Sequence, residues 1–361
     1  YDVKYPCDDG SHGTHTMGTI VGDDGQGNQI GVAPEADWIG CRNMENGFGT
    51  PTTYIECFEW FLAPTDSNGL QANTSMAPHV IANSWGCPPS EGCNPSNFYM
   101  MQLAIENLKN AGTFIAVSAG NDGWSGCNSI RNPASIFEAS FSVGASDILD
   151  TLANFSSRGW VSIDSSFRMK PNVTAPGVNV RSCVPGNSYA NYSGTSMAGP
   201  HVAGAVALLI SAKPSLAGQV DSLENLLEQT ADTIYTYRND TCGTTDQLVF
   251  PNNMVGYGRI NLYKALQIIR PDLTNNIKQV SPAASLGIFP NPFTNTVQIK
   301  TSLPIGNCTI IIVDAFGKIV KQMNSFFTTH LEINLSDLPK AVYFMHLNNG
   351  KTSLMGKLIK Q

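Results

Sequence analysis

Apolar segments of strand length alternate with longer helical patterns through the first 270 residues. The strand-like segments lie at 36–42, 79–86, 113–121 and 139–146, and the helical patterns lie at 52–62 and 97–112. Gly112 is expected to end the second helix, because glycine readily adopts the left-handed conformation that closes a helix. Strands that alternate with helices predict a mostly parallel sheet with helices on both faces, which is an α/β fold.

A further helical pattern, at 196–212, is apolar on all sides. Such a helix is typical of a protein core, because no side of it is suited to water. Its longest apolar run, 202–210, is much shorter than the roughly 18 residues that a membrane span needs. We therefore expect a buried core helix and no membrane span.

From Ala283 onward the pattern changes to short alternating or apolar segments that are separated by Gly, Pro, Asn and Asp. This texture predicts a small all-β domain, a sandwich. A polar stretch with two prolines, 271–284, precedes it. We expect this stretch to be a linker between a domain at 1–270 and a domain at 285–361.

The distribution of charge supports that boundary. The formal net charge is −7, and residues 283–361 hold seven Lys against three Asp or Glu, a net of +4, which leaves −11 for residues 1–282. An acidic chain is also a poor partner for nucleic acid, whose phosphates require a basic surface.

Nine cysteines are a high count for a cytosolic protein, and they favour an oxidising compartment. Cys87 and Cys93 enclose a short, turn-rich loop that could close as a disulfide, with free buried thiols as the alternative. The odd total leaves one cysteine unpaired or paired outside the chain.

The segment GTSMAGPH (194–201) places Ser196 at the start of the predicted core helix, with Pro200 expected in the first helical turn. Unpaired N–H groups and the helix dipole favour developing negative charge at such a position. Serine is a weak nucleophile and needs a histidine base that is oriented by a third group.

The order of the histidines restricts the chemistry of Ser196. A lipase-like nucleophile elbow needs its histidine after the serine, where the sequence offers only His201 in the same motif and two histidines in the β domain. His12 is the better base, behind a helix-start signal in which Asp9 is the expected cap. His15, His79 and His201 are expected to be structural.

The string HGTH around His12 also allows a metal site as an alternative. Its ligands would be His12, His15, Cys7 and either Asp8 or Asp9. The string lacks the Glu of H-E-x-x-H and a clear third histidine, so we prefer the nucleophilic interpretation.

Asn121 follows a buried strand in the segment SAGND, at the strand end where open α/β sheets gather their active sites. Its amide could stabilise an oxyanion together with the backbone N–H of Ser196. The alternative is an asparagine that only forms a turn.

Together these segments resemble the subtilisin-like serine proteases over about residues 7–266. The matching motifs, in the family's order, are HGTHTMG (12–18), ANSWG (82–86), SAGN (118–121), VTAPG (173–177), GTSMAGPH (194–201) and YGRINLYKAL (257–266). The segments IGCRNM and YIECFEWFLAPTD are similar to the bacillopeptidase F-like branch. The resemblance implies a secreted serine endopeptidase that cleaves through an acyl-enzyme.

The resemblance also implies roles for individual residues: His12 as general base, Ser196 as nucleophile and Asn121 as oxyanion donor. Ser84, Trp85 and Gly86 would pair with an extended substrate backbone, and Ala119 and Gly120 would border an apolar or broad pocket for the side chain before the cut. The chemistry would need no cofactor. Structural calcium often accompanies the family, but no carboxylate cluster in this sequence identifies a calcium site.

The sequence departs from the family at its start. The family's acid is an Asp in a D-T-G or D-S-G context on an earlier strand, whereas only eleven residues precede His12, and Asp2, Asp8 and Asp9 lack that context. We therefore expect a fragment of an active protease, impaired because the loss of that acid costs about 3 × 10⁴ in rate. The alternative is a non-catalytic, protease-like binding or scaffold protein.

Residues 285–361 resemble the type A sorting domain of the type IX secretion system. The resemblance rests on the patterns P-N-P-F, D-x-x-G-K and L-x-x-x-x-Y-F, with Ala341 in place of the more usual Gly. It implies export across the outer membrane, with the secretion machinery as a partner beside protein or peptide substrates. The alternative is a carbohydrate-binding sandwich, for which Tyr343 and Phe344 form a poor platform because neighbours on a strand face opposite ways.

Overall fold

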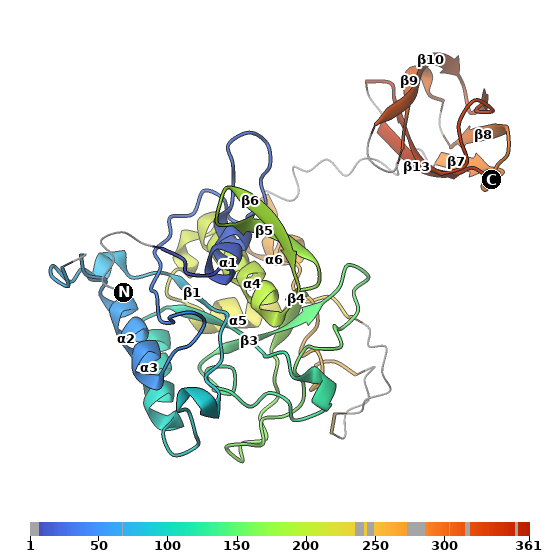
Figure 1. The fold of residues 1–361 in the computed structure, drawn as a ribbon. Coiled ribbons are helices and arrows are strands. Elements are labelled where there is room, and N and C mark those ends of the chain that lie inside the picture. The colour runs from blue at the N-terminus through green and yellow to red at the C-terminus, as the bar shows by residue number, and fades with distance from the viewer. Residues whose placement is uncertain are drawn as a thin grey trace. The chain divides into compact units, whose positions relative to one another are not determined.

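The computed structural model describes residues 7–66, 68–234, 242–243, 249–272, 286–302, 304–314, 318–350 and 353–361. The chain divides into two compact units, Tyr1–Thr274 and Asn275–Gln361. The predicted linker at 271–284 lies outside the described residues from 273 onward. Figure 1 shows the two units.

A four-stranded sheet forms the centre of the first unit. Its strands run in the order β1 (Val80–Asn83), β2 (Phe114–Ser118), β3 (Phe141–Ser146) and β4 (Val173–Pro176). Every neighbouring pair is parallel. The carboxyl ends of all four strands therefore lie at one edge of the sheet, which confirms the predicted parallel α/β architecture.

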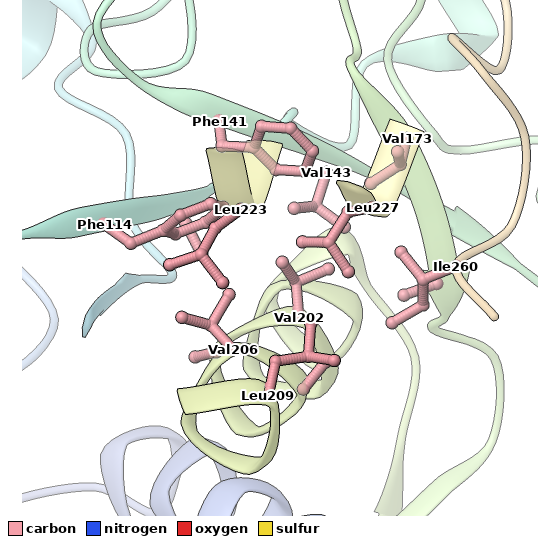
Figure 2. Packing of buried hydrophobic residues seen from close by; sticks show 14 of the residues in the cluster. Phe114, Phe141, Val143, Val173, Val202, Val206, Leu209, Leu223, Leu227 and Ile260 are labelled. Carbon is pink, nitrogen blue, oxygen red and sulfur yellow. The ribbon is translucent and has the colours of Figure 1, made fainter. Parts of the chain in front are cut away.

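Helices cover both faces of this sheet, and the two-residue period of a strand explains how. Phe114 and Ala116 of β2 pack into a core with α4, α5 and α6, whereas Ile115 and Val117 pack into a second core with α2 and α3. Figure 2 shows the first core, where side chains of β2, β3 and β4 meet those of α4 and α5. The α-helices are α1 (His12–Val21), α2 (Pro51–Leu62), α3 (Phe98–Asn110), α4 (Thr195–Ala212), α5 (Val220–Gln229) and α6 (Leu262–Ile269). Short 3₁₀-helices lie at Thr74–Met76, Pro89–Glu91, Gly123–Ser125 and Pro214–Leu216.

Helix α4 is the central helix of the unit, as its uniformly apolar sequence predicts. It packs on all four strands of the sheet. By length and composition alone it would pass for a membrane span, but most of its residues are buried inside the unit. The same apolar surface that a membrane would cover is here covered by the sheet, α1 and α6.

The predicted strand at 36–42 is wrong. None of these residues is assigned to a strand, and Trp38 is 61% exposed. Alternating apolar residues form a strand only where a neighbouring chain supplies hydrogen bonds, and within the described ranges this segment has no such neighbour. The helices predicted at 52–62 and 97–112 are confirmed as α2 and α3, and Gly112 follows α3 with a positive φ of 92°.

Three disulfides join Cys41 to Cys57, Cys87 to Cys93 and Cys127 to Cys242. The second is the bridge that the spacing of Cys87 and Cys93 suggested. Cys7, Cys183 and Cys308 remain as free thiols.

A buried lysine lies at the amino-terminal end of the sheet. Lys170 is 2% exposed, and its Nζ donates to the Ser140 carbonyl and, over 2.9 Å, to Asn172 Oδ1. The Asn172 amide in turn donates to Glu228 on α5. Burial lowers the pKa of Lys170 to about 8, although the charges of Glu138, Glu224 and Glu228 oppose this shift.

This lowered pKa predicts that stability rises with pH between about 8 and 10. In that window the unfolded chain keeps the proton on Lys170 while the folded chain loses it, so the free energy of unfolding should increase by about 2–3 kcal/mol. Urea unfolding followed by tryptophan fluorescence measures this, because all five tryptophans lie before residue 161. The Lys170→Met variant should lack this increase. An equal slope in the variant would contradict the prediction.

The second unit is built from two antiparallel sheets, which confirms the all-β prediction. One has the strand order β10-β9-β12-β13 and the other β11-β8-β7. Inward side chains of both sheets, such as Ile299 of β8 and Ile310 of β9, share one core. The strands are β7 (Leu286–Phe289), β8 (Thr296–Thr301), β9 (Gly306–Asp314), β10 (Ile319–Phe327), β11 (His330–Asn334), β12 (Val342–Asn348) and β13 (Ser353–Ile359).

The P-N-P-F segment of this unit holds the end of the chain. Asn291 donates to the Lys357 carbonyl and accepts from the N–H of Ile359, and Phe293 is buried beneath the ammonium of Lys360. Tyr343 is buried while Phe344 is 46% exposed, so the two rings do face opposite ways.

Candidate active site

Three segments of the first unit meet at the carboxyl edge of its sheet. Ser84 follows β1, Asn121 follows β2 within three residues, and Ser196 is the second residue of α4. Hydrogen bonds link Ser84 to Ser196, and Asn121 to Thr195. The structure therefore brings together residues from three separate segments, of which Ser84 and Ser196 are 112 positions apart.

Pro200 explains why Ser196 is tied to Ser84. Pro200 is the sixth residue of α4, so the prediction that it lies in the first turn is wrong. Inside a helix, proline offers no N–H to the carbonyl four residues earlier, which here is that of Ser196. The Ser84 hydroxyl donates to that carbonyl instead, over 2.9 Å.

The same two serines share a second hydrogen bond. The Ser196 hydroxyl donates to the Ser84 carbonyl over 3.2 Å. Ser196 is half-buried, and its hydroxyl stands in the first turn of α4, where the helix dipole favours negative charge.

Asn121 presents its amide N–H groups beside Ser196. Its Oδ1 accepts from the backbone N–H and from the hydroxyl of Thr195, at 2.9 and 3.0 Å, which fixes the orientation of the amide. A Cβ placed on Gly194 would lie 3.6 Å from Asn121 Nδ2 and 3.7 Å from the Ser196 nitrogen. Two hydrogen-bond donors thus border one small space, which glycine leaves open.

His12 is the first residue of α1, and Asp8 fixes that helix start. Asp8 Oδ2 accepts from the N–H and the hydroxyl of Thr14, at 2.8 and 2.6 Å. The expectation that Asp9 caps the helix is wrong, because Asp9 turns away to the Arg42 guanidinium at 2.7 Å and to the N–H of Asn46.

The imidazole of His12 is biased toward its neutral form. Desolvation by the surrounding protein and the nearby His15 lower its pKa, and the charge of Asp8 opposes them. Helix α1 packs against α4. Within the described ranges His12 forms no hydrogen bond to Ser196, whose hydroxyl is directed to Ser84.

Two other histidines have the structural roles expected of them. His15 is fully buried, its Nε2 lies 3.1 and 3.2 Å from the carbonyls of Val180 and Ala190, and its ring stacks on Tyr192. These contacts join α1 to the hairpin of β5 (Val180–Val184) and β6 (Ser188–Tyr192). His201 Nδ1 lies 2.8 Å from the Met197 carbonyl.

The segment after β1, Ser84–Gly86, packs against α2 through the side chain of Trp85. The Trp85 ring stacks on Tyr54 with 3.9 Å between ring centroids, and Tyr54 donates to the buried Glu91 over 2.6 Å. The Trp85 ring is therefore packed against the core while remaining partly buried. A Cβ on Gly86 would lie 3.3 Å from the Cβ of Asn132, so a side chain at position 86 would crowd Asn132.

Sequence reasoning missed Tyr54, Glu91 and Thr195, which hold these groups in place, and it considered Asp8 only as a metal ligand or as the family's acid. Thr195 had a usable signal, since it directly precedes Ser196. Tyr54 and Glu91 had none, because α2 and the disulfide loop are brought together only by folding. Across the described part of the chain, no group of three or more His, Cys, Asp or Glu side chains could hold a metal ion.

The chain is similar to known proteases over most of its length. Residues 3–258 match the subtilase family. Bacillopeptidase F of Bacillus subtilis is 40% identical over 283 residues, which are 76% of this chain but only 18% of that protein. Subtilisin DY of Bacillus licheniformis is 34% identical over 63% of this chain and 73% of its own. A solved protease of Pseudoalteromonas arctica covers 71% of this chain and 70% of its own, with a TM-score of 0.53 and 25% identity.

The second unit matches a different family. Residues 287–361 match the C-terminal sorting domain of a secretion system. This domain indicates export across the outer membrane by the type IX secretion system. Because the subtilase match spans well over half of the chain, the protein belongs to the subtilase family of serine peptidases.

Proposed function

We propose that the protein is a secreted serine endopeptidase in which Ser196 is the nucleophile, His12 the general base and Asn121 an oxyanion donor. His12 accepts the Ser196 proton while the serine oxygen attacks a peptide carbonyl. His12 then protonates the leaving amine, and an acyl-enzyme remains. Water, deprotonated by His12, hydrolyses this ester and regenerates Ser196.

The orientation of the Asn121 amide is the observation that carries this proposal. A tetrahedral intermediate has a negatively charged oxygen that needs donors held in advance. Because Asn121 Oδ1 accepts from Thr195, Nδ2 is left to border the space at Gly194 that the backbone nitrogen of Ser196 also borders. An asparagine that merely formed a turn would not need hydrogen bonds from Thr195 to its side chain.

Substrate would lie along the segment Ser84–Gly86 as an extended chain. Because the Trp85 ring is stacked on Tyr54, backbone groups of this segment would pair with the peptide, and the pairing would depend little on the peptide's sequence. Ala119 and Gly120 would border the pocket for the side chain before the cut. Gly120 has a φ of 105°, and a Cβ there would lie 2.9 Å from the Ser157 hydroxyl, which restricts this pocket wall to glycine.

No described carboxylate accepts a hydrogen bond from His12, so we assign the orienting acid to none of them. The chemistry proposed needs no cofactor. The sorting domain would take the protein to the secretion machinery, and protein or peptide substrates would be met at the cell surface or outside the cell.

A fluorophosphonate probe tests this proposal, because it reacts with an activated serine. The full-length wild type should be labelled, and the Ser196→Ala variant should not. Ser193→Ala is the matched control, since that hydroxyl accepts from the N–H of Asn179 and has no other hydrogen bond to a described residue, so its loss should leave labelling unchanged. Labelling that persists in Ser196→Ala would overturn the assignment.

A non-catalytic binding protein is the second candidate, and one observation favours it. The Ser196 hydroxyl donates to Ser84 rather than to His12. The same experiment separates the two candidates, because a binding protein would retain unstructured peptides without any labelling of Ser196.

A further inference from the structure

Asp8 organises the helix turn on which His12 stands. Its two carboxylate oxygens accept three hydrogen bonds: Oδ1 from the N–H of Gly10, and Oδ2 from the N–H and the hydroxyl of Thr14. Thr14 is the third residue of α1, so Asp8 satisfies a backbone donor that the helix cannot satisfy itself. Ser11, at the usual capping position, makes no such bond.

Asp8 also acts on the charge of His12. Despite some desolvation, hydrogen bonds from Thr14 and Gly10 and the neighbouring His12 keep the pKa of Asp8 below its usual value. Asp8 is thus ionised at neutral pH and opposes the groups that lower the pKa of His12. In general, a nearby carboxylate favours the protonated form of an imidazole.

Other titratable groups lie on the elements that pack around α1. They are Arg181, Cys183, Tyr189 and Tyr192 on the β5–β6 hairpin, His201 on α4, and His15 on α1 itself. Arg181 is engaged with Asn28 and with the Tyr189 ring. His15 and Asp8 are the two whose charges shift the pKa of His12.

We propose that Asp8 is a positioning residue for His12: it fixes the first turn of α1 and stabilises the imidazolium that forms when Ser196 loses its proton. This proposal rests on the proposed function for the role of His12. Asp9 offers a matched comparison, because it is the adjacent carboxylate but is paired with Arg42.

Titration of the histidines tests the electrostatic part without any need for activity. With ¹³C-labelled histidine in a Ser196→Ala background, Asp8→Asn should lower the pKa of His12, whereas Asp9→Asn should leave it unchanged. The His12 signal is identified by its loss in His12→Gln. Equal His12 titration curves in Asp8→Asn and Asp9→Asn would overturn the proposal.

Kinetics test the positioning part. Since the base must be neutral, Asp8→Asn should move the acid limb of the kcat/KM profile to lower pH, a change that loss of stability alone would not produce. Asp8→Ala, which also loses the acceptor for Thr14, should lower kcat/KM at neutral pH by about tenfold. Asp9→Ala should match the wild type in both respects. If Asp8→Ala and Asp9→Ala behave alike, Asp8 does not position the base.

The two proposals fail in different ways. If the wild type is not labelled by a fluorophosphonate, the proposed function fails, while the titration of His12 in Ser196→Ala still decides whether Asp8 acts on the imidazole. If the wild type is labelled but Asp8→Asn changes neither the titration nor the pH profile, only the role of Asp8 is refuted.

Discussion

Replacing Ser196 with alanine is expected to lower kcat for peptide hydrolysis by about 10⁶-fold, and replacing His12 with alanine by a similar factor. In the proposed mechanism the two residues act in a single step, since the serine attacks as the histidine takes its proton. The double variant should therefore be no slower than either single variant. Steady-state cleavage of an unfolded protein substrate by the full-length protein measures this, with active sites counted by fluorophosphonate.

His79 provides the control for this pair. It is an exposed histidine directly before β1, and its backbone carbonyl, not its ring, accepts from Phe114. His79→Gln should retain the kcat of the wild type. If His12→Ala kept more than about one hundredth of the wild-type kcat, another group would have to serve as the base.

Asn121→Asp is expected to lower kcat by about 10²–10³-fold with little change in KM. Aspartate keeps an oxygen that can accept from Thr195, so the anchor survives. It has no amide N–H to donate, and its charge repels an oxyanion. The loss falls on kcat because the donor is needed only when the carbonyl oxygen becomes charged.

A second substitution separates the donor from the anchor. Asn121→Ala removes both, so it should show a comparable fall in kcat and, in addition, a loss of about 1 kcal/mol in the free energy of unfolding. Asn121→Asp should unfold like the wild type. A kcat for Asn121→Asp within about threefold of the wild type would show that Asn121 is not an oxyanion donor.

The sequence predicted the fold well wherever burial alone decides the structure. The strands β2 and β3 are buried at every position and consist of apolar and small residues, and α4 is apolar on every side, so their positions in the core follow from composition. The segment 36–42 shows the limit of that reasoning. It has a strand's alternation of apolar residues, but pairing depends on a neighbouring chain that the local pattern does not reveal.

For the candidate site, sequence reasoning located some of the residues that lie together and missed others. Ser196 and Asn121 could be found because each lies at an element boundary that the sequence marks clearly. The cap of α1 could not, because the shape of the loop, and not the residue type, decides whether Asp8 or Asp9 reaches the N–H of Thr14. The Trp85 ring stacks on Tyr54, which lies 31 residues earlier and is brought near by folding.

The proline in α4 has a consequence for the resting enzyme. Because Pro200 has no N–H to donate to the Ser196 carbonyl, the Ser84 hydroxyl donates to it instead. The Ser196 hydroxyl in turn donates its proton to the Ser84 carbonyl. A peptide lying along Ser84 would compete for that same carbonyl with its own N–H. Arrival of the chain to be cut would thereby free the serine proton for His12. Ser196 would therefore stay hydrogen-bonded to Ser84, and unable to pass its proton to His12, until a peptide is bound.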